Sequence, residues 1–405
     1  MLFFTKNNMV SYEHINNKTE TILKELHKEI IDAYNYVKKT SFKKQTTVRK
    51  ITSVSQIPKP LLFSTKSFPE EIRNHIDESM ITEITYTFSI YNRNAKIHFI
   101  LEDGINENTL TTFNRYVDSV AIWLYILNIY SSKECVNNIT IYFYFTSLEK
   151  HLPESNIHIL DENNVNTAFT TTCPKESEIV VFRKEEWFKV FIHETFHNFG
   201  LDFSGMNSKY INDCVLSIFK VDSLANTYEA YTEFWAEVMN AAFCSFFSLK
   251  DKTDTTKFVS DFEMFMNFER AHSFFQLEKT LQFMGLTYYD LYSKTRNSSI
   301  LRENMYKEKS NVLSYYILKT VLLNNYQGFL VWCGKNNFNL LNFKKTTTNL
   351  KEFCKFIERN YKTSCMLDGI ENAHNFYMKI KNNNSNNKLS ANILSNMRMS
   401  ICELG

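Results

Sequence analysis

The stretch that decides the fold is Phe191–Gly200, FIHETFHNFG, which contains the pattern His-Glu-x-x-His. Residues four apart on a helix share one face, so His193 and His197 can direct two imidazole nitrogens at one metal ion, with Glu194 beside them. Helical periodicity runs over residues 184–199, and the glycine that follows is suited to ending a helix. The stretch therefore predicts a metal-binding helix.

The residues around this motif are apolar, namely Val190, Phe191, Ile192, Phe196 and Phe199. A helix with so many apolar residues is expected to be buried. Two imidazoles and a carboxylate are costly to bury without partners, so they need a metal ion or a dense hydrogen-bond network. Zinc fits the two-histidine spacing. The alternative is a structural histidine pair bonded to backbone carbonyls.

A zinc site for catalysis needs a third protein ligand and leaves a fourth position for water. The helix predicted at residues 226–247 carries Glu229, Glu233 and Glu237, which recur every four residues along one stripe. Like charges on one stripe repel each other, and a zinc ion with its two histidines would relieve that repulsion. A solvated acidic face is the alternative interpretation.

The two motifs together resemble the gluzincin-type zinc metallopeptidases, which include thermolysin-like enzymes and lethal-factor-type toxin proteases. The resemblance rests on His193-Glu194-x-x-His197 and on Glu233–Glu237, EFWAE, which begins 36 residues after the second histidine. In that family a downstream helix carries a glutamate that binds zinc and, four residues later, an acid that orients a ligand histidine.

The resemblance implies a role for each matching residue: His193, His197 and Glu233 as zinc ligands, Glu194 as the catalytic general base, and Glu237 as the partner that orients a ligand histidine. Glu229 is the reserve ligand, because Glu229 and Glu233 are four residues apart, as Glu233 and Glu237 are. In that frame, however, Thr232 stands where the family pattern prefers a small residue.

The metzincin peptidases are a competing interpretation, because His193-x-x-x-His197-x-x-Gly200 also begins their signature. Their third ligand lies three residues beyond the glycine, and Phe203 occupies that position here. Asp202 is one residue short, so a metzincin site would need a shifted geometry.

The segments around the motif predict an α+β fold, with a small sheet and the His-Glu-x-x-His helix followed by a mainly helical subdomain. The resemblance implies that this fold is zincin-like, with a twisted sheet. The expected sheet segments are a hairpin of 81–91 and 97–101, and strands at 139–145, 166–171 and 178–182. The expected helices cover 17–39, 108–130, 226–247, 257–283, 302–330 and 349–359. The resemblance implies that 166–171 is the edge strand that pairs with an extended substrate.

Three parts of the chain are expected. Residues 1–75 form an N-terminal helical extension and linker, residues 76–205 the zincin subdomain with the sheet, and residues 206–405 the helical subdomain that supplies the third zinc ligand.

The charge balance is nearly neutral, with 46 Lys+Arg against 44 Asp+Glu and a net charge of +2, which argues against nucleic acid as a partner. The longest apolar run, residues 120–127, is too short to span a bilayer, and residues 1–8 lack the apolar core of a signal peptide. We therefore expect no membrane partner.

The eight cysteines are widely spaced and form no Cys-x-x-Cys pair, so we expect free, buried thiols in a reducing compartment and a cytoplasmic protein. The abundance of Asn, Lys, Phe and Tyr, with only 8 Gly and 5 Pro, resembles proteins encoded by large AT-rich DNA viruses. That resemblance implies the host cytoplasm or a virion.

The sequence thus predicts a zinc-dependent metallopeptidase that hydrolyses a peptide or protein substrate, with Glu194 as the general base for a zinc-activated water. The donor that stabilises the oxyanion stays open among His272, Tyr288, Tyr289, Tyr315 and Tyr316. The alternative function is a catalytically silent zinc-binding scaffold with four protein ligands, in which Asp202 or Glu229 supplies the fourth.

Overall fold

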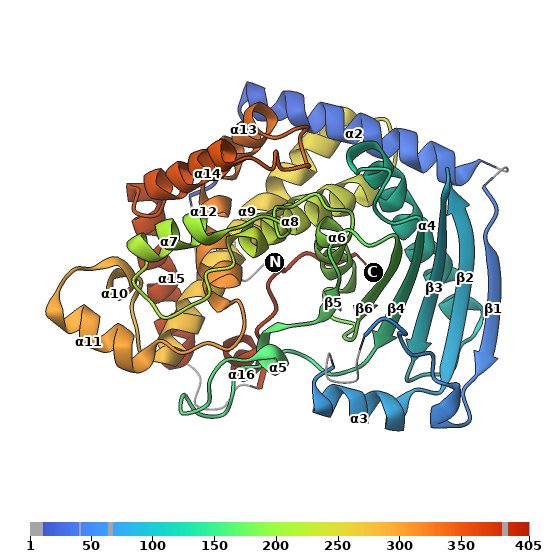
Figure 1. Ribbon diagram of the computed structural model, residues 1–405, viewed down its shortest axis with the longest axis horizontal. Coiled ribbons are helices and arrows are strands. Elements are labelled where there is room, and N and C mark those ends of the chain that lie inside the picture. The colour runs from blue at the N-terminus through green and yellow to red at the C-terminus, as the bar shows by residue number, and fades with distance from the viewer. Residues whose placement is uncertain (1–10, 40–41, 64–67, 383–387, 405) are drawn as a thin grey trace.

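The computed structural model describes residues 11–39, 42–63, 68–382 and 388–404, and it has an α+β fold with an open six-stranded sheet (Figure 1). The spatial order is β1-β2-β3-β4-β6-β5. The strands are β1 (Gln45–Lys50), β2 (Thr82–Ile90), β3 (Arg93–Leu101), β4 (Asn138–Phe145), β5 (Ala168–Thr170) and β6 (Glu176–Val181). Strands β3, β4 and β6 are parallel, and the other pairs are antiparallel. The expected α+β class is confirmed.

Strand β4 is buried on both faces because helices and loops cover both sides of the sheet. Alternate residues Ile139, Ile141 and Phe143 belong to the main core, together with helices α4 (Glu107–Tyr130) and α6 (Trp187–Asn198). Tyr142 and Tyr144 face a smaller apolar cluster under α3 (Glu70–Ser79). The predicted strand at 139–145 and helix at 108–130 are confirmed.

The N-terminal part of the chain belongs to the body of the fold. Helix α2 (Asn17–Lys38), predicted at 17–39, buries Leu23, Leu26 and Ile30 in the main core and lies against α4 and α9 (Thr255–Met284). Strand β1 pairs with β2 although we expected its residues to lie in a linker. The segment that we expected to be an extension thus adds a helix and an edge strand.

Helices form most of the chain after residue 205. They are α7 (Lys209–Ile218), α8 (Thr227–Ser248), α9, α10 (Tyr288–Tyr292), α11 (Arg296–Met305), the π-helical turn η3 (Leu313–Leu318), α12 (Lys319–Asn324), α13 (Tyr326–Asn336), α14 (Thr347–Asn360), α15 (Ser364–Asn382) and α16 (Lys388–Ser395). The predicted helices at 226–247, 257–283 and 349–359 correspond to α8, α9 and α14. The single helix expected at 302–330 is several shorter pieces, because Asn325 caps α13 and residues 306–311 are not helical.

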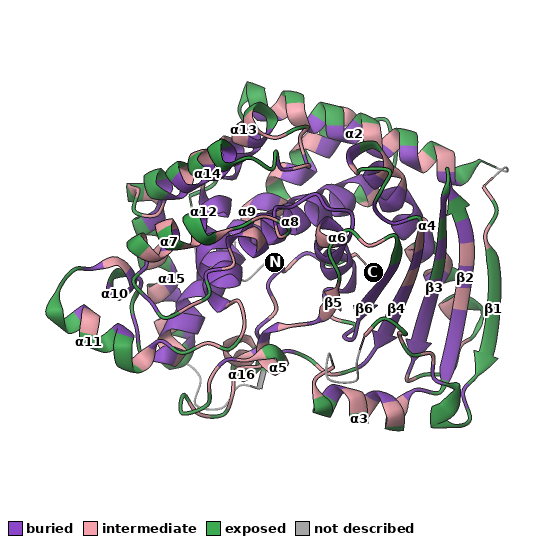
Figure 2. Cartoon of the chain, in the orientation of Figure 1, coloured by how far each residue is buried: buried purple, intermediate pink, exposed green. Residues whose placement is uncertain are grey.

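Helix α8 lies at the centre of the molecule and is buried from Glu229 to Phe246, as Figure 2 shows. It packs against α6 on one side and α9 on another. A helix that is apolar all round is typical of such an interior position. Its few polar side chains therefore have to find partners inside the protein.

Four of the eight cysteines form disulfides, which corrects the expectation of free thiols. Cys135 and Cys173 pair because they precede the neighbouring parallel strands β4 and β6, and Cys214 pairs with Cys354 between α7 and α14. Cys244, Cys333, Cys365 and Cys402 are free. In the described part of the chain, no helix combines the length and apolarity that crossing a bilayer requires.

Candidate metal centre

Helix α6 carries the His-Glu-x-x-His motif directly after β6, in the interior between the sheet and α8 (Figure 1). The helix starts after Glu186, whose backbone is in the left-handed region at φ 58°, and it ends before Gly200 at φ 64°. Trp123 of α4 donates a hydrogen bond to the hydroxyl of Thr195 at 2.8 Å and so fixes the middle of the motif. The position of the helix is thus set at both ends and at its centre.

Three ligand atoms converge at the motif. The Nε2 atoms of His193 and His197 lie 3.2 Å apart, and Oε2 of Glu229 lies 3.1 Å from the first and 3.4 Å from the second. Ligands of a tetrahedral zinc ion, at bond lengths of about 2.0–2.2 Å, are separated by roughly 3.3–3.6 Å. The three atoms therefore have the chemistry and nearly the spacing of a zinc site.

The other nitrogen of each imidazole contacts a buried carboxylate. Glu233 approaches Nδ1 of His193 at 2.8 Å, and Asp202 contacts Nδ1 of His197. Metal-binding histidines usually donate their second N–H to such an acceptor, which fixes the tautomer and the ring orientation. Asp202, weighed from the sequence as a possible ligand, lies in this orienting position.

The geometry shifts the expected glutamate roles by one helical turn. Glu229 has the ligand position that the sequence assigned to Glu233, and Glu233 has the orienting position assigned to Glu237. Glu237 is fully buried and pairs with Lys319 at 2.5 Å, away from both imidazoles. The shift arises because Glu229, in the first turn of α8, is the residue that faces both Nε2 atoms.

The charges of the centre are strongly coupled. Burial alone would lower the pKa of His193, but its hydrogen bonds to Glu229 and Glu233 raise that pKa to about 9. Burial alone would raise the pKa of Glu233, but Lys189, whose Nζ lies 2.5 Å from its carboxylate, and His193 lower it well below the usual range. Burial alone would raise the pKa of Glu229 as well, but His197 and His193 hold it far below the usual range. Both carboxylates are therefore ionised near neutral pH, as a cation site requires, and a bound metal ion would displace the proton that His193 holds there.

Glu194 lies beside the ligand atoms in a small cavity. It is 7% exposed, and burial raises the pKa of its carboxyl group, an effect that His193 and His197 partly offset. The cavity has a volume of about 30 Å³, which is room for one or two water molecules. Thr167 and Ala168, at the start of the predicted edge strand, line the same cavity, and β5 does lie at the edge of the sheet.

Of the five candidate oxyanion donors, Tyr315 lies at the centre. Its hydroxyl donates to Oε2 of Glu229 at 3.1 Å, and its ring lies edge-on to His193. The hydroxyls of Tyr316 and Tyr288 donate instead to the backbone carbonyls of distant residues. His272 contacts the carbonyl of Arg398, and Tyr289 is exposed.

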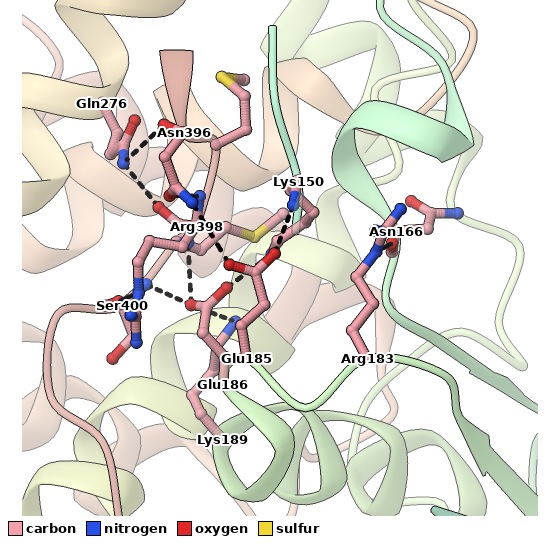
Figure 3. Close-up of polar contacts among 12 residues, drawn as sticks. Lys150, Asn166, Arg183, Glu185, Glu186, Lys189, Gln276, Asn396, Arg398 and Ser400 are labelled. Atoms are coloured by element: carbon pink, nitrogen blue, oxygen red, sulfur yellow. Dashed lines mark hydrogen bonds and ion pairs between the residues drawn. The ribbon is translucent and has the colours of Figure 1, made fainter. Parts of the chain in front are cut away.

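A buried ionic network, which the sequence analysis missed, adjoins the centre (Figure 3). Lys189 lies 3.8 Å from Glu186, and Lys150 pairs with Glu186 at 2.6 Å. Met399, Lys150 and Lys189 also line the cavity of Glu194. The sequence could have indicated that Lys189 lies near the centre, because Lys189 precedes His193 by four residues and so shares its helix face. Lys150 and Met399 had none, because only the tertiary fold brings them there.

Comparison with known proteins identifies no relative of the chain. The chain matches no family model, no curated protein and no solved structure.

Proposed function

We propose that the protein is a zinc-dependent metallopeptidase with a zincin-type core. The observation that carries this proposal is the convergence of Nε2 of His193, Nε2 of His197 and Oε2 of Glu229 next to the carboxylate of Glu194. Two histidines and one glutamate are the ligand set of several catalytic zinc sites in peptidases.

His193, His197 and Glu229 would hold the ion, while Glu233 and Asp202 keep the two imidazoles oriented. Bound zinc supplies Lewis acidity toward a carbonyl oxygen and a water molecule. Glu194 takes a proton from the attacking water and delivers it to the leaving amine, for which its buried carboxylate with a raised pKa is suited. The hydroxyl of Tyr315 is the donor available to the carbonyl oxygen of the scissile bond.

A peptide backbone has a docking edge beside these groups. Strand β5 ends the sheet, with β6 as its one neighbour in the strand order, and residues at its start line the cavity of Glu194. An extended substrate can add to such an edge through main-chain hydrogen bonds. This arrangement favours a peptide or protein substrate.

The alternative, a silent zinc scaffold, would use four protein ligands and leave no position for water. Among the described residues, the candidate ligand group at the motif consists of His193, His197 and Glu229. Asp202, one of the two residues considered as a fourth ligand, is bonded to Nδ1 of His197 and to Ser204. An open fourth position favours the peptidase.

The deciding experiment compares the protein with Glu194→Gln on an unstructured protein substrate. We expect zinc-dependent cleavage by the unchanged protein, inhibition by a chelator and recovery with added zinc. Glu194→Gln should bind about one zinc ion per chain and cleave nothing, whereas Glu25→Gln, on the exposed face of α2, should be fully active. Cleavage by Glu194→Gln would exclude Glu194 as the base, and absence of cleavage by the zinc-loaded unchanged protein would favour the scaffold.

A further inference from the structure

The chain after α16 runs through the interior of the molecule and ends beside α6 (Figure 1). We call residues 396–402 the C-terminal segment. Met397, Met399, Ser400 and Cys402 in this segment are buried. Its start pairs with the chain near Lys150, because the N–H of Met397 donates to the carbonyl of Lys150 at 2.8 Å. An extended segment thus occupies the protein interior next to the metal centre.

Buried ionic side chains hold the backbone of this segment (Figure 3). Glu186 accepts hydrogen bonds from the N–H groups of Met399 and Ser400 at 2.9 and 2.5 Å. Lys319, which also pairs with Glu237, donates to the carbonyl of Met399 at 3.0 Å. Such charge-assisted bonds to main-chain groups fix the position of residue 399 independently of its side chain.

Glu269 of α9 holds the next residues in the same way. Its carboxylate accepts from the N–H groups of Ile401 and Cys402 at 3.1 and 2.9 Å, and from the hydroxyl of Ser400. Glu269 is buried, so displacing the segment would leave its carboxylate without these hydrogen-bond donors, which is energetically costly. These hydrogen bonds therefore fix the backbone of the C-terminal segment in the protein interior.

Met399 is the residue of this segment that reaches the metal centre, and it lines the same cavity as His193 and Glu194. Lys150 and Lys189 also line that cavity, but their ammonium groups are paired with Glu186 and Glu233. The remaining lining is mixed: Val165, Val190 and Met399 are apolar and of substantial size, and Met399 is the largest of these apolar side chains. The polar residues Asn166, Thr167 and Tyr315 line the cavity as well. At about 30 Å³, this space admits only a small group.

We infer that Met399 determines substrate specificity by limiting the side chain next to the scissile bond to a small one, such as that of Gly, Ala or Ser. The inference rests on the proposed function, since it assigns the substrate class of the same site. Shortening Met399 should open the cavity into the space that its side chain fills, while the segment keeps its backbone bonds.

The test measures ligand binding to the zinc-loaded protein, independently of turnover. The probes are the hydroxamates of N-acetyl-glycine, N-acetyl-alanine and N-acetyl-phenylalanine, which chelate zinc and differ in their side chains, and calorimetry gives their affinities. The unchanged protein should bind the phenylalanine probe about tenfold or more weaker than the alanine probe. In Met399→Ala that difference should vanish or reverse, and in Met399→Val it should shrink.

Met397→Ala is the matched control, because Met397 is buried in the same segment and does not line the cavity. It should keep the preference of the unchanged protein. Equal binding of all probes by the unchanged protein would overturn the role of Met399, even if neither variant folds. An equal shift in Met397→Ala would overturn it as well.

A parallel cleavage assay with peptides that differ in this one side chain separates the two proposals. Cleavage with a preference that Met399→Ala leaves unchanged would overturn the role of Met399 and support the peptidase. A relaxed probe preference without any cleavage would support the role of Met399 in ligand recognition and overturn the peptidase. Failure of the unchanged protein to bind zinc would overturn both.

Discussion

Glu229 faces Nε2 of His193 at 3.1 Å, while Glu233 faces Nδ1 of the same imidazole at 2.8 Å. Two carboxylates one helical turn apart on α8 therefore contact both nitrogens of one ring. The first nitrogen points toward His197 and is suited to metal binding, and the second is suited to orienting the ring. This arrangement separates the roles of two glutamates that helical periodicity alone leaves equivalent.

We expect Glu229→Ala to lose bound zinc, because it removes one of three ligand atoms. Glu233→Gln should still bind zinc, with an affinity lowered roughly 10–100-fold, because it weakens the orienting bond to His193 and the ion pair with Lys189 but removes no ligand atom. Zinc content after dialysis and a competition titration measure both effects. Glu237→Gln, which alters the pair with Lys319, is the control and should leave zinc affinity unchanged. Stoichiometric zinc in Glu229→Ala would return Glu233 to the ligand position.

Tyr315→Phe should lower kcat roughly 100-fold and leave the zinc content unchanged, because it removes a hydrogen-bond donor at the centre but no ligand. Steady-state kinetics on a peptide substrate measure the effect. The neighbouring Tyr316→Phe is the control, since that hydroxyl donates to the carbonyl of Met397. If both variants lose activity equally, a specific role for Tyr315 is excluded.

The disulfide between Cys135 and Cys173 should stabilise the end of α6, the helix that carries the two proposed histidine ligands. The N–H of Cys173 donates to the carbonyl of His197 at 3.2 Å, and both cysteines lie against Gly200. We expect Cys135→Ser to lower the free energy of unfolding by about 3 kcal/mol and to weaken zinc binding. Urea unfolding and zinc titration measure these changes.

The control for this prediction is Cys214→Ser, which removes the bridge between α7 and α14. It should destabilise the fold and leave zinc affinity unaltered. Free thiols at positions 135 and 173 in the purified, non-reduced protein, detected by mass spectrometry, would contradict the prediction.

Glu83 should make the fold sensitive to acid. Burial alone would raise its pKa, but hydrogen bonds from His98, Arg49 and Thr85 lower it to about 2. The unfolded chain takes up this proton near the ordinary pKa of 4.5, so the stabilisation by Glu83 is complete above that pH and is lost as the pH falls toward 2. Urea unfolding at several pH values should show a weaker acid dependence for Glu83→Gln. Glu78→Gln, at an exposed position of α3, should keep the original dependence.

Local patterns in the sequence correctly predicted the features that depend only on residues close together in the chain. The spacing of His193 and His197 is a property of one helix, and the buried strand at 139–145 is a run of apolar residues. Strand β1 escaped prediction because all its residues are exposed and its strand form comes from pairing with β2. Its Thr-rich sequence has no apolar alternation that could reveal this pairing.

The choice among Glu229, Glu233 and Glu237 could not be made from periodicity, because residues four apart share a face whichever one meets the metal. The crossing of α8 over α6 decides it, and that crossing is a property of the tertiary fold. The same holds for the disulfides, since Cys135 and Cys173 meet only because β4 and β6 are neighbours.

The position of Met399 has a consequence for synthesis. His193 is translated about 200 residues before the segment that walls its cavity. A growing chain can form α6 and α8 before residue 399 has been added, so Met399 reaches the cavity in a later step. Contacts between residues so far apart in the sequence are slow to form, so the packing of Met399 against the cavity should be one of the late steps of folding.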